Sequence, residues 1–268
     1  MKKLVAGLFL VGLAVMSTTN NVNNVEAEKF EVSIVSSEAE PITSPSYMNI
    51  GVIEKVQKQI GYISVGSVAV KAFKQDIAPT VEVVSYNDSI DYVVDADSSW
   101  LKVYKGDYEI GYIEAEYVSP TKDEGRAVSM PNHKNFKSYM PYTALSSKSS
   151  KQYALQGIAT TGFGGIRTVN DRYCIAVGTA LDCEVGQYIT LVQENGVELD
   201  CIVGDIKDNR DTESNNIVTS ANGCVSEFIV DQSNMDMTAK KLGSMNGLGD
   251  DWDSKVIEIV VWDYVEEL

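Results

Sequence analysis

Two apolar stretches of this chain each carry a carboxylate where a strand pattern calls for a buried side chain. The first reads Leu199-Asp200-Cys201-Ile202-Val203-Gly204-Asp205-Ile206-Lys207-Asp208, and the second reads Gly223-Cys224-Val225-Ser226-Glu227-Phe228-Ile229-Val230-Asp231. An acid inside such a run costs free energy unless it is paired or functional. Asp205 and Glu227 are therefore candidate catalytic residues, and Asp231 is a third, less favoured one. The alternative is that these acids are solvated and inert in turns or at strand edges.

The residues around these stretches predict a mainly β domain over residues 138–268. The Asn195-Gly196 pair is a strong hairpin signal, and Ser149 or Ser150 and Ser233 are candidate helix caps. Strand patterns recur at short intervals, over Tyr173 to Val177, Gln187 to Val192, Glu198 to Val203, Phe228 to Val230 and Lys255 to Tyr264. Six or seven strands with one or two short helices are typical of a mixed barrel.

Residues 61–120 predict a second, smaller β-barrel. Short strand patterns separated by turn residues run over Ser64 to Phe73, Val81 to Tyr86, Asp91 to Asp95, Trp100 to Tyr104 and Glu109 to Ile113. Residues 121–137 have almost no apolar periodicity and are predicted to be an interdomain linker. Residues 28–60 are interpreted as a linker that includes one strand.

The charge balance argues against nucleic-acid binding. The chain has 22 Lys and Arg residues against 38 Asp and Glu residues, a formal charge of -16. Affinity for nucleic acid comes mainly from basic side chains that neutralise phosphates, and no basic patch is present in the sequence. We therefore expect no nucleic-acid partner.

The first 27 residues are predicted to be a secretory signal peptide. Lys2 and Lys3 precede an apolar run from Leu4 to Met16, and Val25-Glu26-Ala27 is a suitable cleavage site. The alternative is a membrane anchor, but thirteen apolar residues fall short of the roughly 20 that a bilayer span needs. The mature protein is accordingly expected to be secreted to the cell wall or medium, without a transmembrane span.

The cysteine pattern leaves two alternatives open. Outside the cell, an even number of cysteines suggests disulfides, whereas buried free thiols also occur in protein cores. The candidate disulfide cysteines are Cys174, Cys183, Cys201 and Cys224. They form no C-x-x-C motif, and the single histidine, His133, lies outside the cluster, so we expect no zinc or other metal site and no cofactor.

The end of the first predicted barrel resembles a bacterial SH3 domain. Ser99-Trp100-Leu101-Lys102-Val103, Gly111-Tyr112-Ile113 and Glu116-Tyr117-Val118 follow the closing strands of that family, with Tyr112 where Trp is common. The resemblance covers about fifty residues. It implies binding to cell-wall peptides, and a structural spacer with the same fold is the alternative.

The C-terminal domain resembles the double-psi β-barrel called the 3D domain, found in lytic transglycosylases and Gram-positive cell-wall proteins. Residues 174–179 match a segment that in the family carries an Asp and Pro, which this chain lacks, and Asp205-Ile206-Lys207 matches a loop without its two glycines. Glu227 falls on the position of the family's later Asp. The resemblance implies a six-stranded double-psi barrel that follows the SH3-like barrel.

The side-chain inventory restricts the chemistry to carboxylates. Residues 138–268 contain no histidine and no G-x-S-x-G motif, which excludes a Ser-His-Asp hydrolase. Cleavage of a glycosidic bond needs an acid that protonates the leaving oxygen, and a carboxyl serves that role. The hypothesis is a lytic transglycosylase-like enzyme of peptidoglycan, with Asp205 or Glu227 as acid/base. The alternative is a non-catalytic wall or surface protein.

Three further residues are candidates for substrate binding. Tyr142 could stack on a sugar ring, although core packing of such tyrosines is the alternative. Thr161 lies in a T-x-G segment and Lys207 in the D-I-K segment of the domain that resembles the 3D family. With Asp205, Glu227 and Asp231 they make up the predicted site, and the predicted partner is a cell-wall glycan.

Overall fold

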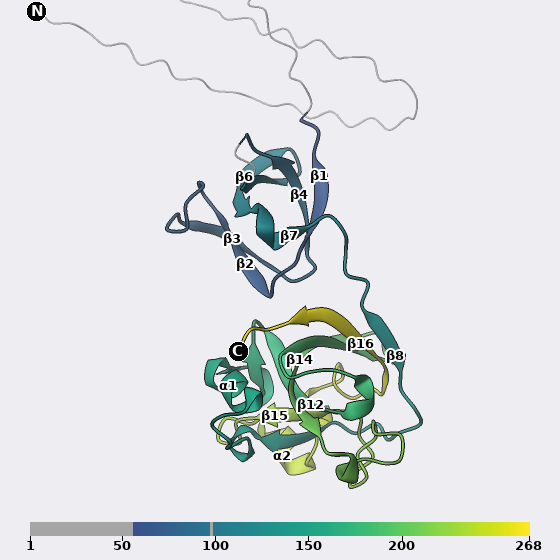
Figure 1. The fold of residues 1–268 in the computed structure, drawn as a ribbon. Coiled ribbons are helices and arrows are strands. Elements are labelled where there is room, and N and C mark those ends of the chain that lie inside the picture. Colours follow the sequence, from purple (N-terminus) through teal and green to yellow (C-terminus); the bar gives the residue numbers. More distant parts are fainter. Residues whose placement is uncertain (1–55, 97–98) are drawn as a thin grey trace, which may run out of the picture. The chain divides into compact units, whose positions relative to one another are not determined.

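The computed structural model describes residues 56–96 and 99–268. The predicted signal peptide and most of residues 28–60 lie outside the described residues. Within them the fold is mainly β, with a seven-stranded antiparallel sheet, a nine-stranded mixed sheet and two short α-helices, α1 (Lys151–Ile158) and α2 (Met237–Leu242) (Figure 1). The mainly β class with short helices is thus confirmed.

The seven-stranded sheet is built from residues 59–119. Its order is β3-β2-β6-β5-β4-β1-β7, and a single 3-10 turn, Ala115–Tyr117, separates the last two strands in sequence. Leu101, Val103 and Ile113 are buried in its core and alternate with partly exposed positions, as is typical of half-buried strands. The strands are β1 (Gln59–Ile63), β2 (Ser67–Lys71), β3 (Thr80–Ser85), β4 (Ser89–Val94), β5 (Trp100–Lys105), β6 (Tyr108–Glu114) and β7 (Val118–Ser119).

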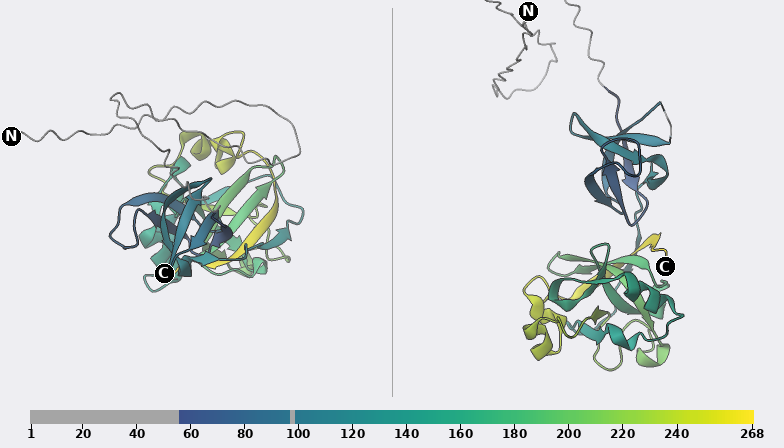
Figure 2. Two further views of the ribbon diagram at one scale, coloured as in Figure 1. Left: turned by 90° about the horizontal axis from the view of Figure 1, so that it is seen from above. Right: turned by 90° about the vertical axis from the view of Figure 1, so that its left-hand side faces the viewer.

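The nine-stranded sheet contains two parallel pairs, β12 with β14 and β15 with β9. The main order is β10-β11-β12-β14-β13-β16-β8, and β15 joins β12 to β9. The yellow C-terminal strand runs beside the green strands in both views of Figure 2, in agreement with the β13–β16 pairing. The strands are β8 (Arg126–Ser129), β9 (Ser138–Pro141), β10 (Thr160–Thr161), β11 (Arg167–Val169), β12 (Arg172–Gly178), β13 (Gln187–Gln193), β14 (Glu198–Lys207), β15 (Glu227–Val230) and β16 (Val256–Val265).

Part of the predicted linker is a strand. Residues 126–129 form β8, which pairs antiparallel with β16. Three of its four residues are exposed, because β8 is the last strand of the order and its side chains cover little of the core. An edge strand of this kind leaves no apolar alternation in the sequence, so residues 121–137 looked like a linker throughout.

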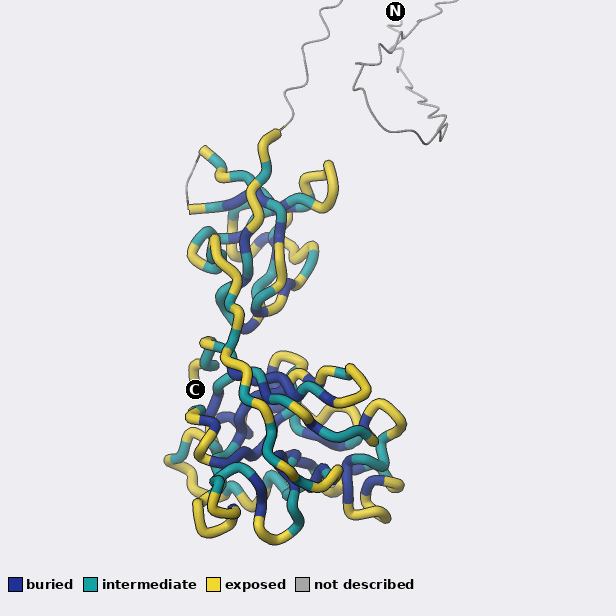
Figure 3. The backbone as a smooth tube through the Cα atoms, turned by 90° about the vertical axis from the view of Figure 1, so that its right-hand side faces the viewer, coloured by how far each residue is buried: buried dark blue, intermediate teal, exposed yellow. Residues whose placement is uncertain are grey.

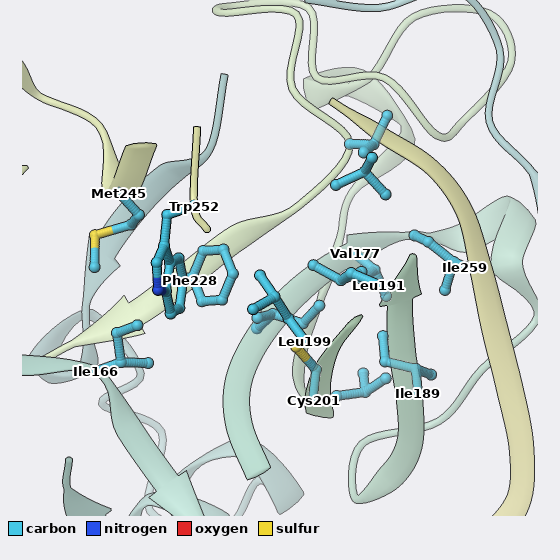
Figure 4. Close-up of a cluster of buried hydrophobic side chains, with 14 of the residues drawn as sticks. Ile166, Val177, Ile189, Leu191, Leu199, Cys201, Phe228, Met245, Trp252 and Ile259 are labelled. Atoms are coloured by element: carbon cyan, nitrogen blue, oxygen red, sulfur yellow. The ribbon is translucent and has the colours of Figure 1, made fainter. Parts of the chain in front are cut away.

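The main hydrophobic core lies on one face of β12, β14 and β15. Val177, Cys201 and Phe228 belong to this cluster, which we call core 1, together with Leu191 and Trp252 (Figure 4). Alternate residues of the same strands point the other way, into a smaller cluster around Leu155 of α1, which we call core 2. Figure 3 shows the buried residues as dark segments surrounded by exposed loops. The nine-stranded sheet therefore has one face on core 1 and one on core 2.

Helix α1 covers the core 2 face beside β14. Ser150 caps it, with Oγ accepting a hydrogen bond from the backbone N–H of Tyr153 at 3.1 Å, as one of the two predicted serines should. Leu155 and Ala159, four residues apart, face the sheet and pack into core 2. The second helix differs from the prediction, because Asp236 rather than Ser233 caps it and Ser233 instead donates to Asp231.

Alanine at Ser150 should destabilise the fold by about 1 kcal/mol, since the orphan N–H groups of α1 lose their side-chain acceptor. Urea unfolding followed by circular dichroism measures the change. Ser149→Ala is the matched control, because Ser149 is exposed and lies one residue before the cap. Equal effects of the two substitutions would contradict the assignment of the cap.

A lysine is buried at the start of β9. Lys137 is 1% exposed, and its Nζ donates to the carbonyl oxygens of Trp252 at 2.8 Å and Ser254 at 2.5 Å. Burial lowers the pKa of its ammonium from 10.5 to about 8. The side chain ties the loop before β16 to β9.

Stability should therefore rise with pH in a defined window. Between pH 8 and 10.5 the unfolded chain binds the Lys137 proton and the folded chain does not, so the free energy of unfolding gains up to about 1.4 kcal/mol per pH unit. Below pH 8 both states are protonated and the contribution is constant. Unfolding of the wild type compared with Lys137→Met from pH 6 to 10 tests this. Lys137→Met should lose this slope, whereas Lys134→Met, at an exposed lysine, retains Lys137 and should keep the wild-type slope.

Candidate functional site

The two favoured candidate catalytic carboxylates, Asp205 and Glu227, lie in one lateral row across the nine-stranded sheet. Ala176 of β12 is opposite Asp205 of β14 on one side and Glu227 of β15 on the other. Ser138 of β9 is in turn opposite Glu227. Residues directly opposite each other share a face of the sheet, so all four side chains lie on the same face. We call Asp205, Ala176, Glu227 and Ser138 the carboxylate row.

A β-bulge brings Asp205 into this row. Val203 pairs with Ile175, whereas the next paired residue, Asp205, is opposite Ala176, so Gly204 is the extra residue. Val203 points into core 1, and without the bulge the acid two residues later would point there too. An added Cβ at Gly204 would lie 2.4 Å from Cδ1 of Ile229, so a larger residue there would force the end of the Ile229 side chain to move. The bulge thus moves a carboxylate from the main core to the other face.

Both carboxylate oxygens of Glu227 are occupied. Oε2 accepts from Nζ of Lys207 at 2.5 Å, and Oε1 accepts from the hydroxyl of Ser138 at 3.1 Å. The side chains of Lys207 and Glu227 are only 11% and 18% exposed. A partly buried ion pair of this kind fixes both groups, because removal of either partner would leave the other charge uncompensated. The Ser138 hydroxyl also lies 3.2 Å from Sγ of Cys224.

Asp205 is held at one oxygen only. Its Oδ1 accepts from Nε2 of Gln152, in the first turn of α1, at 3.2 Å. Across residues 56–96 and 99–268, no hydrogen bond reaches its Oδ2. At two strand spacings of about 4.8 Å each, the Cα atoms of Asp205 and Glu227 are about 10 Å apart. Asp205 is therefore the carboxylate with an oxygen left for a ligand, and Glu227 is the one that is fixed.

Asp231 and Thr161 lie apart from the carboxylate row. Asp231 follows β15 and accepts from Ser233 and Asn234, which lowers the pKa of its carboxyl below the usual value. Thr161 of β10 donates to Asp231 at 3.5 Å and accepts from Arg167 at 2.8 Å. Asp231 therefore holds a turn rather than joining the other two acids.

Tyr142 stands beside Arg167 instead of the row. The guanidinium carbon lies 4.8 Å from the Tyr142 ring centroid, and the same guanidinium binds the carbonyl oxygens of Gln156 and Ala159 at the end of α1. Of the three predicted substrate-binding residues, Lys207 contacts a member of the carboxylate row, and Thr161 contacts only the separate acid Asp231. Tyr142 and Thr161 share Arg167 as a neighbour.

All four cysteines are free thiols. The sequence left disulfides and free thiols open as alternatives, and the structure has free thiols. Burial raises the pKa of the Cys174 thiol to about 12 and that of Cys183 to about 11. Because the thiolate is the reactive form, the raised pKa lowers the reactivity of these two thiols.

Ser138 and Gln152 are site residues that the sequence did not reveal. They reach their carboxylates across 89 and 53 residues of chain, and neither stands out in its local pattern. The bulge did leave a signal, because an isolated Gly inside a strand pattern often marks one. With a bulge at Gly204, Asp205 is expected on the face opposite Val203 instead of on the same face.

Comparison of the chain with protein-family models, with curated proteins and with solved structures finds no match. Among residues 56–96 and 99–268, no helix has the length and apolar character needed to cross a membrane.

Proposed function

We propose that this chain is a secreted, cell-wall-associated protein that cleaves the glycan strands of peptidoglycan. The observation that carries the proposal is the carboxylate row, in which Asp205 and Glu227 flank Ala176 on one face of the sheet. A second support is the difference between the two acids, one with a free oxygen and one locked by Lys207 and Ser138.

Asp205 is the acid/base in this proposal. Its carboxylic proton passes to the glycosidic oxygen as the bond from that oxygen to the sugar C1 breaks. The 6-hydroxyl of the same sugar then attacks C1 and gives its proton to the Asp205 carboxylate, which restores the acid and closes a 1,6-anhydro ring. Glu227 and Lys207 act as positioning residues that fix the polar surface beside the reacting bond.

The finer architecture belongs to the same proposal. The short antiparallel strands of residues 59–119, with a 3-10 turn before the last strand, support an SH3-like barrel that targets the wall. The two parallel pairs β12–β14 and β15–β9 support a double-psi barrel as the catalytic domain. The predicted signal peptide supports export.

Incubation of the purified protein with peptidoglycan tests the activity. Mass spectrometry of the soluble products should find muropeptides that end in a 1,6-anhydro sugar. Reducing-end products alone would mean hydrolysis by water, and no product at all would reject the enzymatic role.

A non-catalytic wall-binding protein is the second candidate. It is favoured by the donors on both acids, because Lys207 and Gln152 occupy oxygens that a reaction would use. The same incubation separates the two candidates: protein that pellets with peptidoglycan without releasing product is a binding protein.

A further inference from the structure

Arg167, on β11, holds the C-terminal end of α1. Its Nη2 donates to the carbonyl oxygen of Gln156 at 3.0 Å and also to that of Ala159. The last carbonyl groups of a helix have no partners inside the helix, and they favour a nearby positive charge. Helix α1 has no basic residue in its own last turn, so Arg167 supplies this charge from a neighbouring strand.

The Arg167 guanidinium is itself fixed by three side chains. Its Nε donates to Oε1 of Gln156 at 3.2 Å, and its Nη1 donates to the Thr161 hydroxyl at 2.8 Å. Its carbon lies 4.8 Å from the centroid of the Tyr142 ring. A planar guanidinium held on several sides has a defined orientation, and the single ammonium of a lysine would not make the same set of contacts.

The first turn of α1 contacts the candidate acid/base. Gln152 lies four residues before Gln156, on the same side of the helix and about 6 Å away along its axis. Nε2 of Gln152 donates to Oδ1 of Asp205 at 3.2 Å, at the long end of the range for such a bond. A displacement of α1 by about 1 Å away from β14 would therefore break this contact.

Helix α1 depends on contacts with the rest of the domain to stay in place. It has eight residues, and isolated helices shorter than about 12 residues are marginal in water. Leu155 packs its middle against core 2, whereas the ion pair of Lys151 with Glu184 at its start joins side chains that are 60% and 56% exposed. An exposed pair of this kind contributes little. We therefore expect the position of the helix to depend on Arg167 more than on Lys151.

We propose that Arg167 is a positioning residue for Asp205 and acts through α1 and Gln152. The inference rests on the proposed function and deepens it, because it assigns what orients the acid/base. The strands that carry Arg167 and Asp205, β11 and β14, pair with β12 on its two opposite sides. The helix thus bridges the two neighbours of β12, and it contacts one through Gln156 and the other through Gln152.

NMR of the side-chain NH2 group of Gln152 tests the proposal in the absence of substrate. Asp205→Ala removes the acceptor and gives the signals of the unbonded amide as a reference. Arg167→Lys keeps the positive charge at the end of α1 but not the planar fork, and it should move the Gln152 signals toward that reference. Gln152 signals that stay at their wild-type values in Arg167→Lys would overturn the proposal.

Arg126→Lys is the matched control for this measurement. Arg126 also donates through Nη2 to a backbone carbonyl, that of Leu181 at 2.5 Å, but it makes no printed contact with α1. The same chemical change at this position should leave the Gln152 signals at their wild-type values. Equal shifts in the two lysine variants would show a general effect on the domain and would also overturn the proposal.

A double-mutant cycle on the rate of anhydro-muropeptide release tests the route from Arg167 to Asp205. Arg167→Lys and Gln152→Met should each lower the rate about tenfold, because a misplacement of about 1 Å at a reacting group costs up to about 10²-fold. The double variant should also lose about tenfold, since both changes break the same contact. A loss of about 10²-fold in the double variant would mean that Arg167 acts by a separate route, against the proposal.

The two readouts separate this proposal from the proposed function. If the wild type released no anhydro product, the enzymatic role would be rejected, and the Gln152 signals would still decide whether Arg167 orients Asp205. Release of anhydro product by the wild type, with unchanged Gln152 signals in Arg167→Lys, would reject the positioning role alone.

Discussion

Asparagine in place of Asp205 is expected to lower the rate of anhydro-muropeptide release by about 10²–10⁴-fold, the range for loss of a general acid/base. The substitution keeps the acceptor oxygen that Gln152 contacts and removes only the proton that the reaction moves. The fold should be unaffected, because Asp205 is only partly buried and makes no ion pair with a described residue. Product release per enzyme, measured by mass spectrometry over time, gives the ratio.

Two companion variants separate the roles of the other acids. Asp231→Asn, in the turn after β15, should retain cleavage because Asp231 lies apart from the carboxylate row. Glu227→Gln removes the ion pair with Lys207 and should lower both activity and stability, since the partly buried ammonium is left without its partner. If Asp205→Asn kept full activity and Glu227→Gln lost it, Glu227 would be the acid/base and Asp205 the positioning residue.

Alanine at Gly178 is expected to destabilise the protein by about 3 kcal/mol, at the upper end of overpacking effects. The new Cβ would lie 2.1 Å from the carbonyl oxygen of Asn216 and 2.9 Å from Cα of Ile217. These are backbone atoms, so the clash is not relieved by rotation of a side chain. Urea unfolding monitored by tryptophan fluorescence measures the loss.

Gly157→Ala is the control, and it should raise the free energy of unfolding instead of lowering it. Gly157 lies inside α1, and an added Cβ there meets nothing within 4 Å. Alanine is favoured over glycine in a helix by about 1 kcal/mol, so this variant should gain stability. A stable Gly178→Ala variant would show that the loop at Asn216 moves away freely.

The strands around the carboxylates were predictable because their patterns are local. The antiparallel pairing of β13 and β14 follows from the Asn195-Gly196 signal between two apolar runs, and the cap of α1 follows from Ser150. The positions of Asp205 and Glu227 as acids at odd points in strands were read from the same local patterns.

The partners of those acids could not be predicted, because they depend on pairings between distant strands. Ser138 meets Glu227 through the parallel pairing of β9 with β15, and Gln152 meets Asp205 through the packing of α1 on β14. Neither pairing follows from spacing along the chain. β8 was missed for another reason, since an exposed edge strand needs no apolar alternation.

The extra residue at Gly204 changes which alternate residues of β14 face core 1. Before it, odd-numbered residues such as Cys201 and Val203 face core 1, and after it the odd-numbered residues Asp205 and Lys207 face the opposite side. Deletion of Gly204 would therefore remove the bulge and leave Asp205 directly after Val203, still opposite Ala176 and still on the face away from core 1.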